Sequence, residues 1–96
     1  MLIDTGFKFG DVVSVKTTTG DELLGSYRGE NSDGSIKLSK VRALGHGESG
    51  FVLMQYIFSV DPDEVININK DLVIVIAKTG KIFADNYSSQ TSSIVL

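Results

Sequence analysis

Short apolar runs, separated by glycines and small polar clusters, recur about every ten residues along the chain. Val, Ile, Thr, Phe and Tyr are common in these runs, which favours β-strands over helices. The pattern predicts five strands: Val12–Thr19, Glu22–Glu30, Ser35–Leu44, a run that begins at Phe51, and Leu72–Ala77. We expect a turn at Gly20-Asp21 and a hairpin turn at Asn31–Gly34, where Asp33-Gly34 favours the positive φ of hairpin turns.

The fourth run, Phe51–Val60, is followed by Asp61-Pro62-Asp63, where proline removes a ladder N–H group. In this interpretation the alternating residues Val65–Asn69 resume the same strand after a bulge. Asn69-Lys70-Asp71 then forms another tight turn. The fourth and fifth strands therefore follow each other closely in the sequence.

The residues after the fifth strand are less typical of strands. Thr79 is expected to cap a short helix near the C-terminus, with Ile82, Phe83 and Tyr87 on its inner face. Residues 88–96 are interpreted as a loose tail. With 96 residues, the chain is expected to form a single all-β domain, a small, strongly bent five-stranded barrel of the SH3-like, OB-like or Sm-like kind.

Two of the predicted strands, Phe51–Val60 and Leu72–Ala77, are apolar on both faces. A small barrel has one interior face, and leaving large side chains in water forgoes roughly 1.5–3 kcal/mol each. We therefore expect a subunit interface, in which strands four and five of neighbouring copies pair to close a ring, rather than burial within one barrel. The expected interface residues are Val52, Met54, Tyr56, Phe58, Leu72, Ile74 and Ile76.

The stretch Val13–Tyr27 combines alternating apolar residues, a glycine turn and a second glycine five residues later. It resembles the first Sm motif of Sm, LSm and Hfq-like proteins, and the resemblance continues through Asn31 and Ile36–Leu38. Ile68–Ile76 resembles the second Sm motif. The two motifs cover about half of the chain, and the wider sequence is also similar to small Sm-like proteins of marine phages.

The resemblance implies a ring of bent five-stranded barrels that binds single-stranded RNA around its pore. Carried over by position, the carboxylate of the first motif falls on Asn31, its asparagine on Ser35 and its stacking side chain near Asp33; the Arg-Gly of the second motif falls on Asn69-Lys70. Each position is polar, but none has the family's usual residue. Without an aromatic at Asp33, a stacking contribution of about 1–3 kcal/mol per base is lost. The alternative is that these are ordinary turn residues.

The amino-acid composition restricts which ligands and cofactors are expected. A net charge of −3 and a pI near 4.9 count against indiscriminate binding to nucleic acid. A ring would nevertheless place one Lys70 per subunit around a common pore, so weak sites would add. The chain has no cysteine and no metal-ligand spacing, so neither a metal nor another cofactor is expected. No apolar run has the ~18 residues of a membrane span, and the cytoplasm is the default compartment. The resemblance implies the cytoplasm of a bacterial or phage-infected host cell.

Gly45–Gly50 reads GHGESG, which satisfies the G-x-G-x-x-G pattern and contains the only histidine, His46. A dinucleotide fingerprint needs a helix after it, whose N-terminus meets the phosphate. Here another strand is predicted to follow, so we expect a loop between strands three and four, away from the nucleotide site. With no recognisable nucleophile–base pair, the protein is expected not to be an enzyme.

Two functional hypotheses remain. The first is an Sm-like homo-oligomeric ring that binds single-stranded RNA, in preference to DNA, in a non-catalytic processing or chaperone role. The second is a structural or adaptor ring that acts through protein contacts, for example in phage assembly. The resemblance to both motifs favours the first hypothesis, whereas the acidic pI and the altered family residues favour the second.

Overall fold

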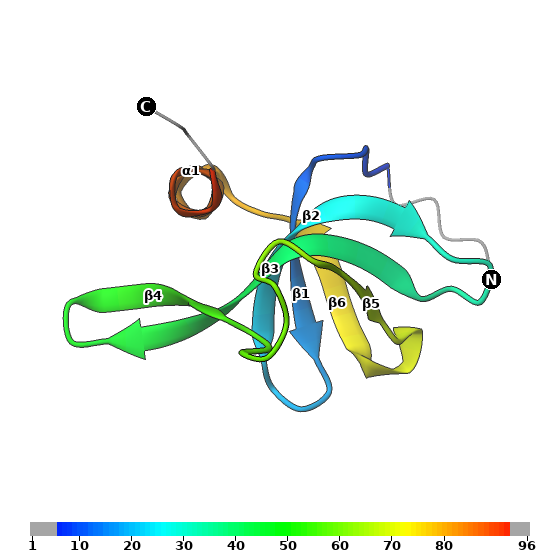
Figure 1. Ribbon diagram of the computed structural model, residues 1–96, viewed down its shortest axis with the longest axis horizontal. Coiled ribbons are helices and arrows are strands. Elements are labelled where there is room, and N and C mark those ends of the chain that lie inside the picture. Colours follow the sequence, from blue (N-terminus) through cyan, green and yellow to red (C-terminus); the bar gives the residue numbers. More distant parts are fainter. Residues whose placement is uncertain (1–5, 93–96) are drawn as a thin grey trace.

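The computed structural model describes residues 6–92. Within this range a single antiparallel sheet has the strand order β4-β3-β2-β1-β6, and β5 also pairs with β3 (Figure 1). The elements are β1 (Val12–Thr17), β2 (Glu22–Glu30), β3 (Ile36–Gly47), β4 (Gly50–Gln55), β5 (Val65–Ile68), the 3-10 turn η1 (Lys70–Leu72), β6 (Val73–Lys78) and α1 (Lys81–Thr91). A small β-rich fold with a C-terminal helix is thus confirmed, but with six strands in the described range instead of five.

The predicted fourth strand is wrong, because it corresponds to two separate strands that share one edge of β3. β5 pairs with β3 at Ile36–Ser39, and β4 pairs with it at Arg42–Gly47. The run that begins at Phe51 leaves the sheet after Gln55, whose side-chain amide donates to the carbonyls of Ile57 and Val60 at 2.9 and 2.7 Å. These two bonds close a turn, so the later residues of the run do not continue the ladder.

A bulge bends β3 where its two partners meet. Ser26 lies opposite Ser39 and Leu24 opposite Arg42, so Gly25 alone faces two residues of β3. One of them, Lys40, has a φ of 53°, in the left-handed region. A Cβ at Gly25 would lie 3.0 Å from the Leu38 Cβ, so glycine is what allows β2 and β3 to approach so closely here.

The core lies inside the curved sheet and follows the alternation of its strands. In β1, Val13 and Val15 are fully buried, whereas the intervening Ser14 is half-buried and Lys16 is exposed. The buried core cluster consists of Val13, Val15, Leu23, Tyr27, Ile36, Leu38, Val41 and Ile68. The alternation is regular in β1, whereas β2 buries three consecutive residues, Leu23–Gly25.

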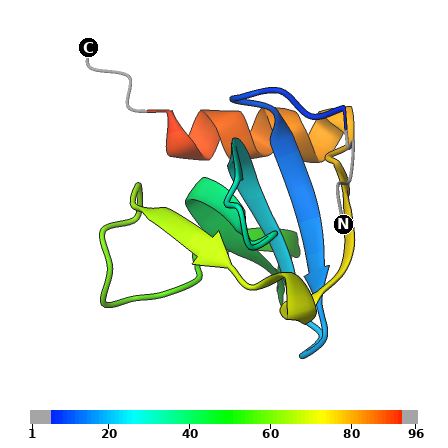
Figure 2. The same cartoon turned by 90° about the vertical axis from the view of Figure 1, so that its right-hand side faces the viewer.

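Helix α1 lies across the top of the sheet (Figure 2). Gly80 is its N-cap, and the Thr79 hydroxyl, the expected cap, instead shares a hydrogen bond of 2.7 Å with Ser14. Tyr87 is buried as expected, but Ile82 is 76% exposed, so it is not on the inner face. The expected loose tail is helical as far as Thr91, which is buried. Residues 93–96 lie outside the described range.

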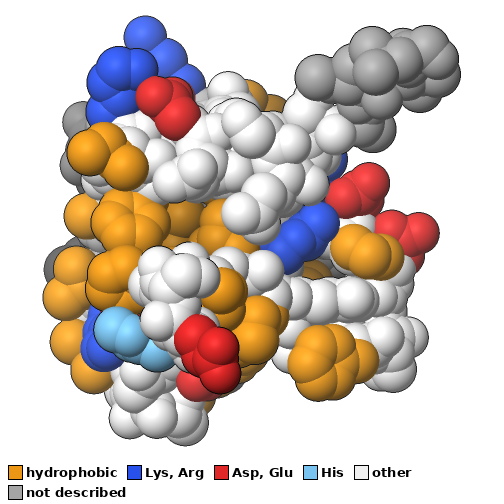
Figure 3. Space-filling model, turned by 90° about the vertical axis from the view of Figure 1, so that its left-hand side faces the viewer, with side chains coloured by type: hydrophobic (Ala, Val, Ile, Leu, Met, Phe, Trp, Pro, Cys, Tyr) orange, Lys and Arg blue, Asp and Glu red, His pale blue; other side chains and the backbone are white. Residues whose placement is uncertain are grey.

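The far half of β3 and β4 form a hairpin arm (residues 44–55) that projects from the rest of the sheet (Figure 1). His46 pairs with Phe51 within this hairpin, so only Glu48 and Ser49 form its turn. The expected six-residue loop is therefore too long. The rings of His46 and Phe51 lie 4.5 Å apart, and Phe51 meets Phe83 of α1 edge-on at 5.4 Å. Figure 3 shows apolar side chains gathered on this face, beside His46.

Candidate nucleic-acid site

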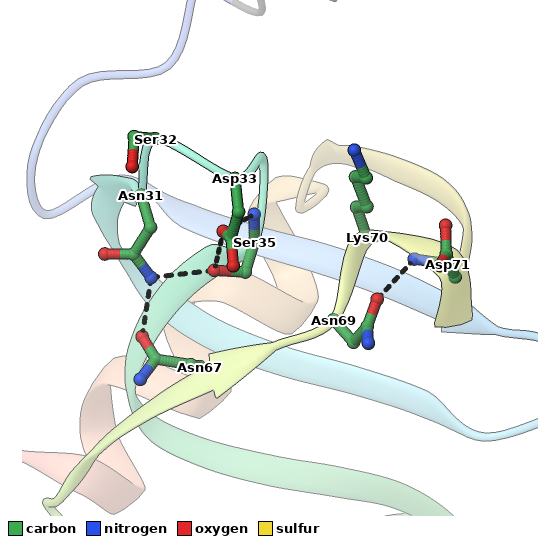
Figure 4. A pocket seen from close by; sticks show the side chains of 8 residues that line it. All are labelled: Asn31, Ser32, Asp33, Ser35, Asn67, Asn69, Lys70 and Asp71. Atoms are coloured by element: carbon green, nitrogen blue, oxygen red, sulfur yellow. Dashed lines mark hydrogen bonds between the residues drawn. The ribbon is translucent and has the colours of Figure 1, made fainter.

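A pocket of about 600 Å³ opens where the β2–β3 turn meets the turn between β5 and η1 (Figure 4). The pairing of Ile36 with Ile68 and of Lys37 with Asn67 brings these two distant segments together. The lining residues are Asn31, Ser32, Asp33, Ser35, Asn67, Asn69, Lys70 and Asp71. All five residues singled out from the sequence (Asn31, Asp33, Ser35, Asn69 and Lys70) therefore line one pocket, at the opposite end of the molecule from the hairpin arm.

The turn from Asn31 to Ser35 forms one wall. The Asn31 N–H donates to the Ser35 backbone carbonyl at 2.9 Å, and the Gly34 N–H donates to the Asn31 backbone carbonyl at 3.0 Å. The Asp33 carboxylate accepts from the Ser35 N–H at 2.9 Å, and Gly34 takes a φ of 88°. Local turn chemistry, which the sequence pattern predicted, thus positions these side chains.

A chain of side-chain hydrogen bonds crosses the pocket wall (Figure 4). The Asn31 amide nitrogen donates to Ser35 Oγ at 2.7 Å and to Asn67 Oδ1 at 3.0 Å, and Ser35 Oγ donates to Asp33 Oδ1 at 2.7 Å. The hydrogen bonds from the Ser35 hydroxyl and N–H lower the pKa of Asp33, with a smaller effect from the Lys70 charge. Asp33 is therefore ionised at neutral pH.

Asn67 is a site residue that the sequence analysis missed. It lies on β5 and accepts the hydrogen bond from Asn31. Its spacing of two from Asn69 was the available signal, because alternate residues of a strand share a face. The sequence predicts Val65–Asn69 as the end of a longer strand, and only its pairing with β3 brings Asn67 to Asn31.

Asn69 and Lys70 form the opposite wall. Asn69 Oδ1 accepts from the Asp71 N–H at 2.9 Å and caps η1. The Lys70 stem lies over Gly34, where a Cβ would come within 2.9 Å of the Lys70 Cδ. Within residues 6–92 the Lys70 ammonium forms neither a hydrogen bond nor an ion pair, so it is available to an anion.

The pocket can bind through polar contacts rather than by stacking. Its amides offer donors and acceptors for the edge of a base, and Lys70 offers one charge for a phosphate. The negative charges of Asp33 and Asp71 partly offset the positive charge of Lys70. None of the described lining residues is aromatic. Among residues 6–92, no cluster of three His, Asp or Glu side chains is arranged to hold a metal ion.

The residues expected at a subunit interface divide into two groups. Val52, Met54, Phe58, Leu72 and Ile74 are exposed, whereas Tyr56 and Ile76 are half-buried and pack against the core. Within the described range β5 pairs only with β3, and β6 only with β1, so each leaves one edge unpaired. Val65 on β5 and Val75 on β6 are also exposed, although they were not among the expected residues.

Among solved structures, the chain is similar to a chain in the crystal structure of the NatC complex bound to CoA. The identity is 15% and the TM-score 0.52, and the match covers 91% of this chain and 97% of the other. At this identity the likeness shows the fold alone, a small β-rich domain shared over nearly the whole of both chains. No family model and no curated protein matches the sequence. No helix within residues 6–92 is long and apolar enough to cross a membrane.

Proposed function

We propose that this chain forms an Sm-like homo-oligomeric ring that binds single-stranded RNA, in preference to DNA, and acts without catalysis. One observation carries the proposal: the five positions to which the Sm resemblance assigns RNA contacts, in two turns far apart in the sequence, line a single pocket. Amide groups for a base and a free ammonium for a phosphate are the chemistry that such a ligand needs.

The free edges of β5 and β6 support the ring. Ile74 on β6 is 61% exposed, and the neighbouring Val75 and the β5 residue Val65 are exposed as well. Pairing β5 of one copy with β6 of the next would satisfy both edges and cover these side chains. The short strand β5, not the run that begins at Phe51, is then the partner of β6. A ring would repeat the pocket, so weak sites would act together.

The test of RNA binding is the fluorescence anisotropy of short U-rich and A-rich RNAs, with a DNA of matched length, at two salt concentrations. Because each phosphate contact releases counterions, Lys70→Ala is expected to weaken binding and to reduce the salt slope by about one for each phosphate that Lys70 neutralises. Lys81→Ala is the matched control, since Lys81 is exposed on α1 and pairs with Asp85. If the wild-type protein binds no RNA near physiological salt, the RNA-binding proposal is wrong.

A second candidate is a structural or adaptor ring that acts through protein contacts. Two features favour it: two carboxylates flank the single ammonium of the pocket, and the hairpin arm exposes apolar side chains, with Phe51 57% exposed. This function predicts a ring in light scattering together with no RNA binding in the anisotropy test. The two candidates therefore differ in a single pair of measurements.

A further inference from the structure

The chain of hydrogen bonds from Asp33 to Asn67 has a direction that its chemistry imposes. The ionised Asp33 carboxylate can only accept, so the single hydroxyl proton of Ser35 points to Asp33, at an Oγ–Oδ1 distance of 2.7 Å. Ser35 Oγ then faces Asn31 as an acceptor. Only the amide nitrogen of Asn31 can donate to it, as observed at 2.7 Å.

The same logic extends to Asn67. The second hydrogen of the Asn31 amide points to Asn67 and requires an acceptor there, which is Oδ1 at 3.0 Å. The side-chain atoms left without a partner within residues 6–92 are Asn31 Oδ1 and the Asn67 amide nitrogen. In Figure 4 both point away from the Asn31–Ser35 contact, on the same side of the pair. The pair thus presents one acceptor and one donor in a fixed order.

We propose that Asp33 is a positioning residue that fixes this order, and that the Asn31–Asn67 pair thereby distinguishes keto bases from amino bases. The inference rests on the proposed RNA-binding function and deepens it. Asp33, the position to which the Sm resemblance assigns a stacking side chain, has a different role here. Its carboxylate acts through Ser35 and Asn31 and does not contact the base.

The chemistry of the bases makes the order decisive. Uracil presents a carbonyl acceptor at position 4 next to an N–H donor at position 3, whereas cytosine presents an amino donor next to a ring-nitrogen acceptor. At the corresponding positions, guanine has the same order of acceptor and donor as uracil, and adenine has the same order as cytosine. For a base held in one placement and read at the edge formed by positions 3 and 4, a fixed acceptor and donor match only one of these two orders. A mismatch leaves two like groups facing each other, which costs binding.

Without the Asp33 carboxylate, the order of acceptor and donor in the Asn31–Asn67 pair would no longer be fixed. Ser35 could then donate to Asn31 Oδ1, and the side-chain amides of Asn31 and Asn67 could flip together. Both orders would become accessible, so the pocket would accept keto and amino bases alike. Asparagine at position 33 keeps an acceptor for Ser35 and should preserve the order, although it removes the charge.

The experiment compares oligo(U) with oligo(C) of equal length, since these pyrimidines have the same ring size and differ in the order of donor and acceptor. The wild-type protein is expected to prefer one of them by roughly tenfold. Asp33→Ala should bring the ratio of the two dissociation constants close to one, and Asp33→Asn should retain the preference. Asp71→Ala is the matched control, because it removes one negative charge from the same pocket and the Asp71 carboxylate makes no hydrogen bond within residues 6–92.

Ser35→Ala interrupts the chain at its next member, so it should also abolish the preference if Asp33→Ala does not fold. A readout without RNA is the NMR signal of the Asn31 side-chain amide. Both of its protons should exchange slowly in the wild-type protein and in Asp33→Asn, and rapidly in Asp33→Ala.

Three results would overturn the inference: no preference in the wild-type protein, a preference that survives Asp33→Ala and Ser35→Ala, or an equal loss in Asp71→Ala. If no RNA binds at all, the proposed function fails, and the NMR comparison still decides whether Asp33 orders the amides.

Discussion

Gly34 links the two walls of the pocket. Its φ of 88° closes the β2–β3 turn, and its missing side chain leaves room for the Lys70 stem. The Asp33-Gly34 pair predicts a turn from the sequence alone. The contact of Gly34 with Lys70, by contrast, joins two turns that are far apart in the chain. A single glycine therefore serves both the local conformation and the position of the cation.

Gly34→Ala is expected to reduce both stability and RNA affinity. The left-handed conformation costs a residue with a side chain about 1–2 kcal/mol, and the new methyl group would displace Lys70. Gly20→Ala is the control, because Gly20 has a φ of 94° and a Cβ added there would meet no atom within 4 Å. Urea denaturation should show similar losses for the two variants, and anisotropy should show weaker binding only for Gly34→Ala. Equal affinities in both variants would contradict the role of Gly34 in placing Lys70.

At the scale of elements, α1 is attached to the sheet at the bulge of β3. The Tyr87 hydroxyl donates to the carbonyl of Lys40 at 2.8 Å and to that of Ser39 at 3.3 Å, next to the positive φ of Lys40. Burial raises the pKa of Tyr87 to about 12, from an ordinary value of 10.0. Because the folded state disfavours the ionised phenol, this contribution to stability is complete below pH 10 and is lost as the pH rises towards 12.

Tyr87→Phe is expected to lower the free energy of unfolding at pH 7 by about 1 kcal/mol, because a buried hydrogen bond is lost. It should also remove part of the decline in stability between pH 10 and pH 12. Urea denaturation of both proteins at pH 7, 10 and 11 measures the two effects. Parallel stability curves across this range would show that the Tyr87 phenol does not couple α1 to alkaline unfolding.

At the scale of the whole molecule, two of the places where described residues expose apolar side chains bear on assembly. One is the hairpin arm with the adjoining face of α1, and the other is the pair of free edges on β5 and β6. The proposed ring uses the second. Edge strands with exposed apolar residues favour pairing with another copy, because unpaired backbone groups and side chains are covered together.

Ile74→Lys is expected to convert the ring into monomers without unfolding them, since a buried ammonium at the strand interface would be strongly unfavourable. Ile82→Lys is the control, because Ile82 is 76% exposed but lies on α1. Size exclusion with light scattering gives the mass of each variant, and circular dichroism verifies the fold. A ring that persists in Ile74→Lys would exclude β6 from the interface.

The sequence by itself determined the features that depend on neighbouring residues. β-rich runs between glycine-containing turns placed β1 and β2, and Asn31–Gly34 was recognised as a turn, because strand preference and turn angles are set by residues a few positions apart. The five candidate residues came from a family resemblance, and the structure places all five around one pocket. Local pattern also argued against a dinucleotide loop at Gly45–Gly50, since a second strand follows it.

Only the tertiary structure decided how the strands after β3 are divided. Apolar runs look alike whether they pair with one half of β3 or the other, so sequence could not separate β4 from β5. The same pairing brings Asn67 to Asn31, which completes the hydrogen-bond chain that begins at Asp33. The cause is the bulge at Lys40, which bends β3 and gives its two halves different partners.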